Sequence, residues 1–131
     1  MASSCDEAHD DLTGKRILIV EDEYYIASDL KRALQQAGAS VVGPVGDLRR
    51  GLALAGQEPL DAAVLDVNLQ ESASFPIADA LDRRSVPYMF LTGYDAWALP
   101  TAYAGAPRLI KPIGVDAVLS EVQALIRQPQ G

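Results

Sequence analysis

Residues 16–22 read RILIVED and decide the fold, because an unbroken apolar run leads directly into two carboxylates. A short, continuous run rich in β-branched residues is typical of a strand buried on both faces of a parallel sheet. From Ile26 to Ala37 apolar residues recur every three to four positions, and Gly38 follows, which predicts a helix that stops at the glycine. A buried strand followed by an amphipathic helix is the repeating unit of parallel sheets.

The same alternation of strand and helix continues along the rest of the chain. Further short strands are predicted at 41–42, 61–67, 88–91 and 108–110, the first of them ending at Gly43-Pro44. Helices are predicted after a cap at Asp47, from a first turn at Pro76, and over 115–126. Residues 94–105 fit neither pattern, because Pro100 interrupts a helix there. We therefore expect an α/β fold with a doubly wound five-stranded parallel sheet in the flavodoxin-like order 2-1-3-4-5 and a short or irregular fourth helix.

Composition and charge exclude several classes of protein. A chain of 131 residues fits one domain, and its 49% hydrophobic and 22% charged residues are typical of a folded globular protein. The net charge of −7 argues against binding to a nucleic-acid backbone, and no apolar run approaches the roughly 20 residues of a membrane span. Cys5 is the only cysteine, which excludes an internal disulfide. The first residues carry no secretory signal, so we expect a cytoplasmic protein with no nucleic-acid or membrane partner.

Polar side chains follow four of the predicted strands at the point where each strand ends. Because the carboxyl ends of parallel strands meet at one edge of the sheet, we expect these side chains to surround a single site. They are Glu21 and Asp22 after the first strand, Asp66 and Asn68 at the end of the third, Thr92 after the fourth, and Lys111 after the fifth.

The carboxylates of this expected site predict a metal ion. Carboxylates gathered in one cleft repel one another, and a hard divalent cation such as Mg²⁺ relieves that repulsion. We expect Asp22 and Asp66 to bind Mg²⁺ directly, Glu21 to bind it through water, and Asn68 to contribute its backbone carbonyl. With the charge balanced, a carboxylate oxygen of Asp66 can act as a nucleophile toward phosphorus.

Phosphoryl transfer spreads negative charge over the phosphoryl oxygens, so the site also needs donors for those oxygens. We expect Lys111 to supply a point charge, Thr92 a hydroxyl group, and the backbone after Asp66 further N–H groups.

These residues and their order resemble the receiver domains of two-component response regulators, and the resemblance covers residues 15–127. It implies that Glu21 and Asp22 are the acidic pair that binds Mg²⁺, and that Asn68 gives its backbone carbonyl to the same ion. It also implies that Asp66 accepts a phosphoryl group from a phosphohistidine on a sensor histidine kinase.

The same resemblance assigns the remaining residues of the site. Thr92 matches the switch hydroxyl of the family, and Lys111 matches its lysine, which is followed by a cis-prone proline, Pro112. Residues 90–94, FLTGY, resemble the FATGY signature of an atypical subgroup called FAT GUY, with Leu91 in place of alanine. Members of that subgroup often act with sensor kinases of the HWE or related classes, some of them in stress responses.

Two features depart from the common receiver pattern. Arg108 stands three positions before the lysine, where most of the family has an aromatic switch residue. Thr92 follows Asp66 by only 26 positions, and the usual Pro-Gly-x-Asp-Gly loop is missing. The familiar coupling between the threonine and an aromatic residue is therefore not expected in its usual form.

The predicted outline is a flexible acidic leader at 1–14, a receiver domain at 15–127 and a short tail at 128–131. Because no output domain fits after Arg127, we expect a stand-alone phosphoacceptor that signals by protein contacts or serves as a phosphate sink or relay. It is not expected to be an ordinary enzyme, since it would catalyse only its own phosphorylation and dephosphorylation. Phosphorylation is expected to bias a switch surface that a downstream protein or a second copy contacts. The predicted members of this surface are Arg108, Tyr94, Trp97, Tyr103 and Pro112.

Two other functions stay open at this point. A degenerate receiver could act as a phosphorylation-independent binding module, and Arg108 together with the missing loop favours that interpretation. A small Mg²⁺-dependent phosphatase could use Asp66 as an aspartyl-phosphate nucleophile on soluble substrates. Haloacid-dehalogenase-like phosphatases, however, carry the nucleophile after their first strand and need a capping insertion that this length does not hold.

Overall fold

A single parallel sheet organises the computed structural model, which describes residues 12–69, 72–93 and 99–127. Its strands lie in the order β2-β1-β3-β4-β5, which confirms the predicted doubly wound, flavodoxin-like fold. Along the chain the elements are β1 (Arg16–Val20), α2 (Tyr24–Gln36), β2 (Ser40–Val45), α3 (Leu48–Gln57), β3 (Ala62–Asp66), α4 (Phe75–Arg83), β4 (Tyr88–Thr92), the 3₁₀ helix η2 (Thr101–Tyr103), β5 (Arg108–Ile110) and α5 (Val115–Arg127).

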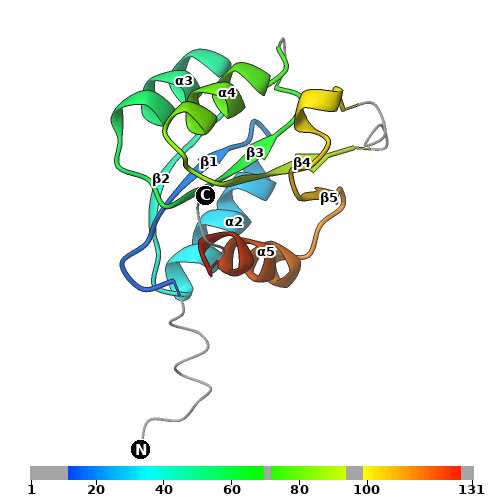
Figure 1. The fold of residues 1–131 in the computed structure, drawn as a ribbon. Coiled ribbons are helices and arrows are strands. Elements are labelled where there is room, and N and C mark those ends of the chain that lie inside the picture. Colours follow the sequence, from blue (N-terminus) through cyan, green and yellow to red (C-terminus); the bar gives the residue numbers. More distant parts are fainter. Residues whose placement is uncertain (1–11, 70–71, 94–98, 128–131) are drawn as a thin grey trace, which may run out of the picture.

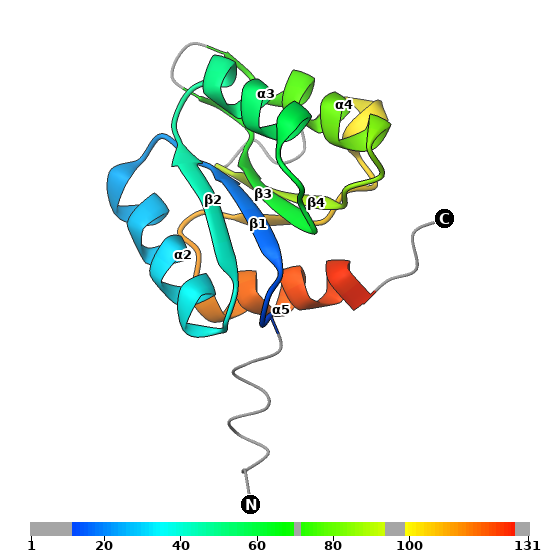
Figure 2. The same cartoon turned by 90° about the vertical axis from the view of Figure 1, so that its left-hand side faces the viewer.

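Helices cover both faces of the sheet. Helices α3 and α4 pack together on one face, and α2 and α5 pack together on the other (Figure 1, Figure 2). Each face has its own hydrophobic cluster: Ile17 and Ile19 point into one, and Leu18 and Val20 into the other. Successive side chains of a strand point to opposite faces, so a strand covered on both sides must be apolar throughout. This is the physical reason for the unbroken run in β1.

Helix α2 ends where the sequence predicts it. Ala37 closes the helix, and Gly38 takes a φ of +98°, a left-handed conformation that glycine adopts without strain. A Cβ at Gly38 would lie 2.9 Å from the Cα of Thr13, so the glycine also lets the segment before β1 pass close by. Leu12, predicted to belong to the flexible leader, is instead buried, and its backbone N–H donates to the carbonyl of Ala37 at 3.2 Å. Leu12 therefore packs with the domain, although it lies before the predicted boundary.

Strand β2 is longer than predicted. It continues through Gly43-Pro44, where we expected it to end, and this peptide bond is cis. The pairing with β1 shifts its register between Leu18 and Val20 and resumes at Val45. β2 lies at the edge of the sheet, and an edge strand tolerates a proline because only one of its sides is paired. The prediction of a strand end at the proline was wrong for this reason.

The described part of the connection between β4 and β5 is short and irregular, in agreement with the prediction. The 3₁₀ helix η2 lies beside α4 (Figure 1). The ring of Tyr103 stacks on Phe75 with centroids 4.5 Å apart and planes 9° from parallel. Its hydroxyl donates a hydrogen bond to Oδ1 of Asp79 at 2.7 Å. Arg108 and Ile110 on one side of β5 are exposed.

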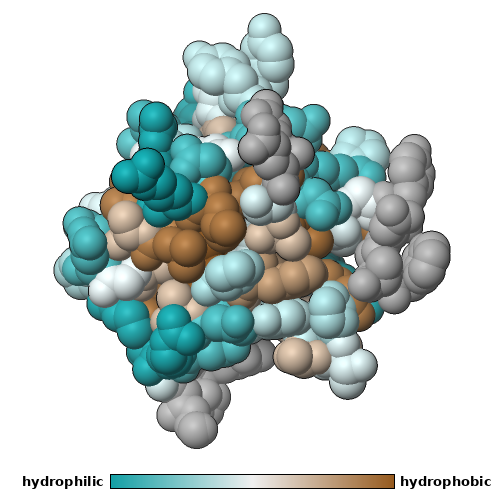
Figure 3. All heavy atoms as spheres, turned by 90° about the horizontal axis from the view of Figure 1, so that it is seen from above, coloured by the Kyte–Doolittle hydropathy of each residue, from teal (hydrophilic) through white to brown (hydrophobic). Residues whose placement is uncertain are grey.

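The surface on the side of α3 and α4 carries both hydrophobic and hydrophilic residues (Figure 3). Hydrophobic residues gather toward the middle of this face, and hydrophilic residues surround them (Figure 3). Leu48, Leu52 and Leu54 of α3 are half-buried and pack on the cluster beneath. Within residues 12–69, 72–93 and 99–127, none of the helices has the length and apolar character that crossing a membrane requires.

Candidate functional site

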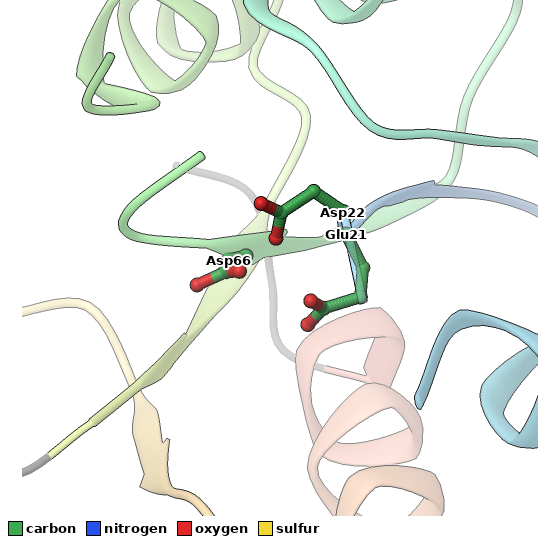
Figure 4. A group of neighbouring side chains, drawn as sticks. All are labelled: Glu21, Asp22 and Asp66. Carbon is green, nitrogen blue, oxygen red and sulfur yellow. The ribbon is translucent and has the colours of Figure 1, made fainter. Parts of the chain in front are cut away.

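Three carboxylates share one space at the carboxyl end of the sheet (Figure 4). β1 and β3 are neighbours, so the residues at their ends, Glu21 and Asp22 on one side and Asp66 on the other, come side by side. One carboxylate oxygen of each residue lies within 4.8 Å of the others. Glu21 and Asp66 are buried, with 3% and 4% of their surface exposed, whereas Asp22 is half-buried. The cluster is therefore accessible to solvent mainly from the side of Asp22.

Lys111 follows β5 and reaches across the site to the carboxylates. Its Nζ donates hydrogen bonds to Oδ2 of Asp66 at 3.2 Å, to Oε2 of Glu21 at 3.2 Å and to Oε1 of Glu23 at 2.6 Å. Burial alone would lower the pKa of Lys111, but the hydrogen bonds to Glu23 and Glu21 and the charge of Asp66 outweigh it and raise that pKa. The ammonium group is therefore charged throughout the neutral pH range.

Thr92 is the last residue of β4 and is buried, with 2% of its surface exposed. The pairing of β4 with β3 places Asp66 opposite Leu91, directly before the threonine. The backbone N–H of Lys111 donates to the carbonyl of Thr92 at 2.7 Å. Asp66, Thr92 and Lys111 therefore occupy the ends of three adjacent strands.

Asn68 stands in the loop that leaves β3. Its backbone N–H donates to Oδ1 of Asp66 at 3.3 Å, and the residue forms an isolated antiparallel bridge with Ala73. The loop thus turns back on itself immediately after the phosphoacceptor candidate. This places the backbone of Asn68 beside the carboxylates, and the role predicted for its carbonyl stays a prediction.

The surroundings of Asp66 change its acidity. Burial and the nearby carboxylate of Glu21 raise the pKa of Asp66 to about 8, although Lys111 acts in the opposite direction. With this pKa, the carboxyl group is largely protonated at neutral pH, and a protonated carboxyl is a poor nucleophile. Positive charge placed beside Asp66 would therefore favour its ionised, nucleophilic form.

The donor set fits a hard divalent cation. Oε1 of Glu21 is buried and accepts no hydrogen bond from the described residues, although it lies 3.1 Å from Nζ of Lys111. Buried carboxylate oxygens ordinarily have hydrogen-bond partners or bind a metal ion. Oxygen atoms from Glu21, Asp22 and Asp66 within one small space are the ligand type that Mg²⁺ prefers. These three residues are accordingly suited to hold the predicted ion.

The structure describes three of the five residues predicted for the switch surface. Arg108 and Pro112 are exposed, whereas Tyr103 is half-buried against α4. Tyr94 and Trp97 lie outside the described residues, so an exposed aromatic cluster there stays a prediction. The peptide bond before Pro112 is cis, the form that the family resemblance implies.

Glu23 belongs to the site, and the sequence did not reveal its role. It makes the shortest of the contacts to Lys111, at 2.6 Å. Helix α2 begins only at Tyr24, so Glu23 is its extended N-cap residue and its side chain turns toward the lysine. The available signal was an acidic residue directly after the acidic pair, but its partner lies 88 positions further along the chain.

Comparison with protein families gives one family match. Residues 17–123 match the sequence profile of the family described as the response regulator receiver domain. This match covers the whole sheet except the first residue of β1, and it includes every residue of the acidic cluster.

Comparison with individual proteins gives similar results. The chain is 34% identical over 122 residues to the transcriptional regulatory protein TcrA of Mycobacterium tuberculosis strain H37Rv, covering 89% of this chain and 48% of TcrA. The chain spans about half the length of the curated relatives it matches.

Solved structures share the fold. The solution structure of SdrG from Sphingomonas melonis Fr1 has a TM-score of 0.75 and 38% identity, over 88% of this chain and 98% of SdrG. The receiver domain of the sensor histidine kinase PA1611 from Pseudomonas aeruginosa PAO1 has a TM-score of 0.73 and 25% identity, over 88% of this chain and 100% of that domain. That crystal structure contains a magnesium ion coordinated in its active-site cleft.

Proposed function

The chain belongs to the response regulator receiver domain family, and we propose that it accepts a phosphoryl group on Asp66 from a sensor histidine kinase in a Mg²⁺-dependent reaction. Receiver domains are signalling modules rather than ordinary enzymes. The observation that carries the proposal is the convergence of Glu21, Asp22 and Lys111 on the buried Asp66 at the carboxyl end of the sheet.

Asp66 supplies the nucleophile. One of its carboxylate oxygens forms a bond to the phosphorus of a phosphohistidine, while the phosphorus–nitrogen bond breaks and the imidazole keeps the electron pair. The products are an aspartyl phosphate and a histidine that takes a proton from water. This transfer depends mainly on positioning and on charge neutralisation, which are the contributions that the neighbouring strand ends make.

Lys111 and Thr92 serve the oxygens of the transferred group. Nζ of Lys111 lies 3.2 Å from Oδ2 of Asp66, so its charge stands beside the oxygens of an attached phosphoryl group. Thr92 ends the strand next to Asp66 and offers a hydroxyl group to the same oxygens. A hydrogen bond from the Thr92 hydroxyl to a phosphoryl oxygen would shift the connection that follows β4. Phosphorylation would thereby change the conformation of the surface beyond the site.

Asp22 and Asp66 would hold Mg²⁺ directly, Glu21 through water, and Asn68 through its backbone carbonyl. When bound, the ion supplies positive charge that favours the ionised form of Asp66 and balances the charge of the phosphoryl oxygens. The magnesium ion in the active-site cleft of the PA1611 receiver domain supports this assignment.

The FLTGY segment at 90–94 supports membership of the FAT GUY subgroup, and with it a kinase of the HWE or related classes. The exposed Arg108 replaces the aromatic switch residue of the common pattern, so we propose that output uses a different contact. The surface around Arg108, Tyr103 and Pro112 is the proposed contact for a downstream protein or a second copy.

Intact-protein mass spectrometry tests the proposed function. The protein is incubated with acetyl phosphate, with and without Mg²⁺, beside an Asp66→Asn variant that keeps the size of the side chain. We expect a Mg²⁺-dependent gain of one phosphoryl group in the wild type and none in the variant.

Other results would favour the two alternative functions, a binding module or a phosphatase. No gain from acetyl phosphate and none from a phosphorylated HWE-class kinase would contradict the proposal and favour a binding module. Rapid turnover of soluble phosphomonoesters would favour a phosphatase instead.

A further inference from the structure

We propose that Glu23 is a positioning residue that holds Lys111 in the resting state and thereby opposes formation of the phosphorylated state. This inference rests on the proposed function of Asp66. It concerns a side chain that is neither the nucleophile nor part of the group of carboxylates suited to a metal ion.

The hydrogen-bond donors of Lys111 are fully used in the resting site. An ammonium group has three N–H donors, and Nζ of Lys111 donates to oxygens of three carboxyl groups, those of Glu21, Glu23 and Asp66. A phosphoryl oxygen on Asp66 needs one of the same donors. Lys111 must therefore give up part of its present pairing when Asp66 becomes phosphorylated.

Glu23 is the partner that Lys111 gives up most easily. The side chain of Glu23 is 57% exposed, so water can solvate its carboxylate once the lysine leaves. The side chain of Glu21 is fully buried, and a buried carboxylate that loses its counter-charge costs much more free energy. The release of Glu23 is thus the change that allows Lys111 to serve the phosphoryl group.

The geometry also shows that Glu23 competes for the lysine in the resting state. Its contact with Nζ, at 2.6 Å, is shorter than the 3.2 Å contact between Nζ and Asp66. The backbone N–H of Glu23 donates to Oε2 of Glu21 at 2.9 Å, which holds the backbone of Glu23 at the rim of the site. Because Glu23 competes with Asp66 for the ammonium group of Lys111, it stabilises the resting state relative to the phosphorylated state.

The test compares the phosphorylated fraction of variants by intact-protein mass spectrometry, at subsaturating acetyl phosphate and saturating Mg²⁺. Glu23→Gln removes the charge and keeps the size of the side chain. We expect the ratio of phosphorylated to unphosphorylated protein to rise about two- to fivefold, the range expected for losing an ion pair whose carboxylate is largely exposed. Asp29→Asn, which removes an exposed acid of α2 that makes no contact with Lys111, should leave the ratio unchanged.

A second variant pair tests whether Glu23 acts through the lysine. In a Lys111→Met background, Glu23→Gln should no longer change the ratio, because the group on which Glu23 acts is gone. A direct readout in metal-free protein uses the side-chain nitrogen signals of the three lysines, Lys15, Lys31 and Lys111. Glu23→Gln should shift the Nζ signal of Lys111 and speed its hydrogen exchange, whereas Asp29→Asn should change neither.

Three results would overturn the inference. In the first, the wild type takes up the phosphoryl group, but Glu23→Gln has the same ratio of phosphorylated to unphosphorylated protein as the wild type. The second is an equal rise in Asp29→Asn, which would indicate a general effect of net charge. The third is a Lys111 signal that Glu23→Gln leaves unchanged. If the wild type takes up no phosphoryl group at all, the proposed function fails, and this inference fails with it.

Discussion

At the scale of single residues, Asp66 is a carboxyl group that the fold holds away from water. It is buried beside Glu21, and Lys111 compensates only part of this unfavourable environment. The metal-free site therefore favours the protonated form of Asp66, whereas phosphoryl transfer needs the ionised form. A cation that binds Glu21, Asp22 and Asp66 resolves this conflict.

The raised pKa of Asp66 predicts how the stability of the metal-free protein depends on pH. That pKa is 3.8 in the unfolded chain and about 8 in the folded protein, so between these values only the folded state holds the proton. The stabilising contribution of this proton is complete below pH 3.8, falls as pH rises, and is lost above about pH 8. The expected loss is at most about 1.4 kcal/mol per pH unit, measured by urea unfolding in EDTA.

The control for this prediction is Asp66→Asn, which carries no titratable group at the position. Its free energy of unfolding should decline less between about pH 6 and about pH 8 than that of the wild type. Equal slopes in the two proteins would show that Asp66 has no raised pKa.

The sequence could predict that Glu21, Asp66 and Lys111 lie close together, because each one stands at the carboxyl end of a strand. Asp66 and Lys111 are 45 positions apart, and parallel strands alone predict that they meet. Glu23 could not be assigned in this way. Its role depends on the direction of its side chain at the start of α2 and on the length of the lysine that comes from β5.

At the scale of elements, the structure confirms the helix cap that the sequence predicts at the start of α3. Asp47 is the N-cap, and its Oδ1 accepts a hydrogen bond from the backbone N–H of Arg50 at 2.8 Å. We expect Asp47→Ala to lower the free energy of unfolding by about 1 kcal/mol, measured by urea unfolding. Asp47→Asn retains the acceptor and should lose much less. A similar loss in both variants would contradict the role of the cap.

An aromatic contact holds the described part of the connection between β4 and β5. Tyr103 stacks on Phe75, and the rings of Phe75 and Phe90 meet edge to face with their centroids 5.8 Å apart. Tyr103→Ala removes this stack and should lower the free energy of unfolding by about 1–2 kcal/mol in thermal or urea unfolding. Tyr103→Phe keeps the ring and loses only the hydrogen bond to Asp79, so it should cost about 0.5–1 kcal/mol. Equal costs would mean that the stack contributes nothing.

Boundaries of elements were harder to predict than their existence. The stop at Gly38 followed from a local conformational preference, and it was correct. The end of β2 was wrong, because whether a strand tolerates Pro44 depends on its place at the edge of the sheet. The contact of Tyr103 with Phe75 joins residues that no local pattern relates, so the sequence could only indicate that residues 94–105 were irregular.

At the scale of the whole molecule, the site belongs to the folded state alone. Glu21 and Asp22 follow β1, whereas Asp66 ends β3, so unfolding separates the carboxylates. A ligand that binds only the folded state stabilises it by mass action, by about 2.7 kcal/mol at a concentration 100 times its Kd. We therefore expect Mg²⁺ to raise the melting temperature of the wild type in a concentration-dependent manner.

Asp22→Asn is the matched variant for this experiment. It removes one predicted ligand that is half-buried and should reduce the stabilisation by Mg²⁺, whereas Asp29→Asn on the surface of α2 should respond like the wild type. Ionic strength is held constant with NaCl to separate binding from screening. An identical response of Asp22→Asn and the wild type would place the ion elsewhere.

The most direct test of the central claim is to find which residue carries the phosphoryl group. The protein is phosphorylated in Mg²⁺, the acyl phosphate is reduced with borohydride to homoserine, and the modified position is identified by peptide mass spectrometry. We predict modification at Asp66 alone, and none without Mg²⁺. Modification at another carboxylate, or modification at Asp66 that does not require the ion, would contradict the account.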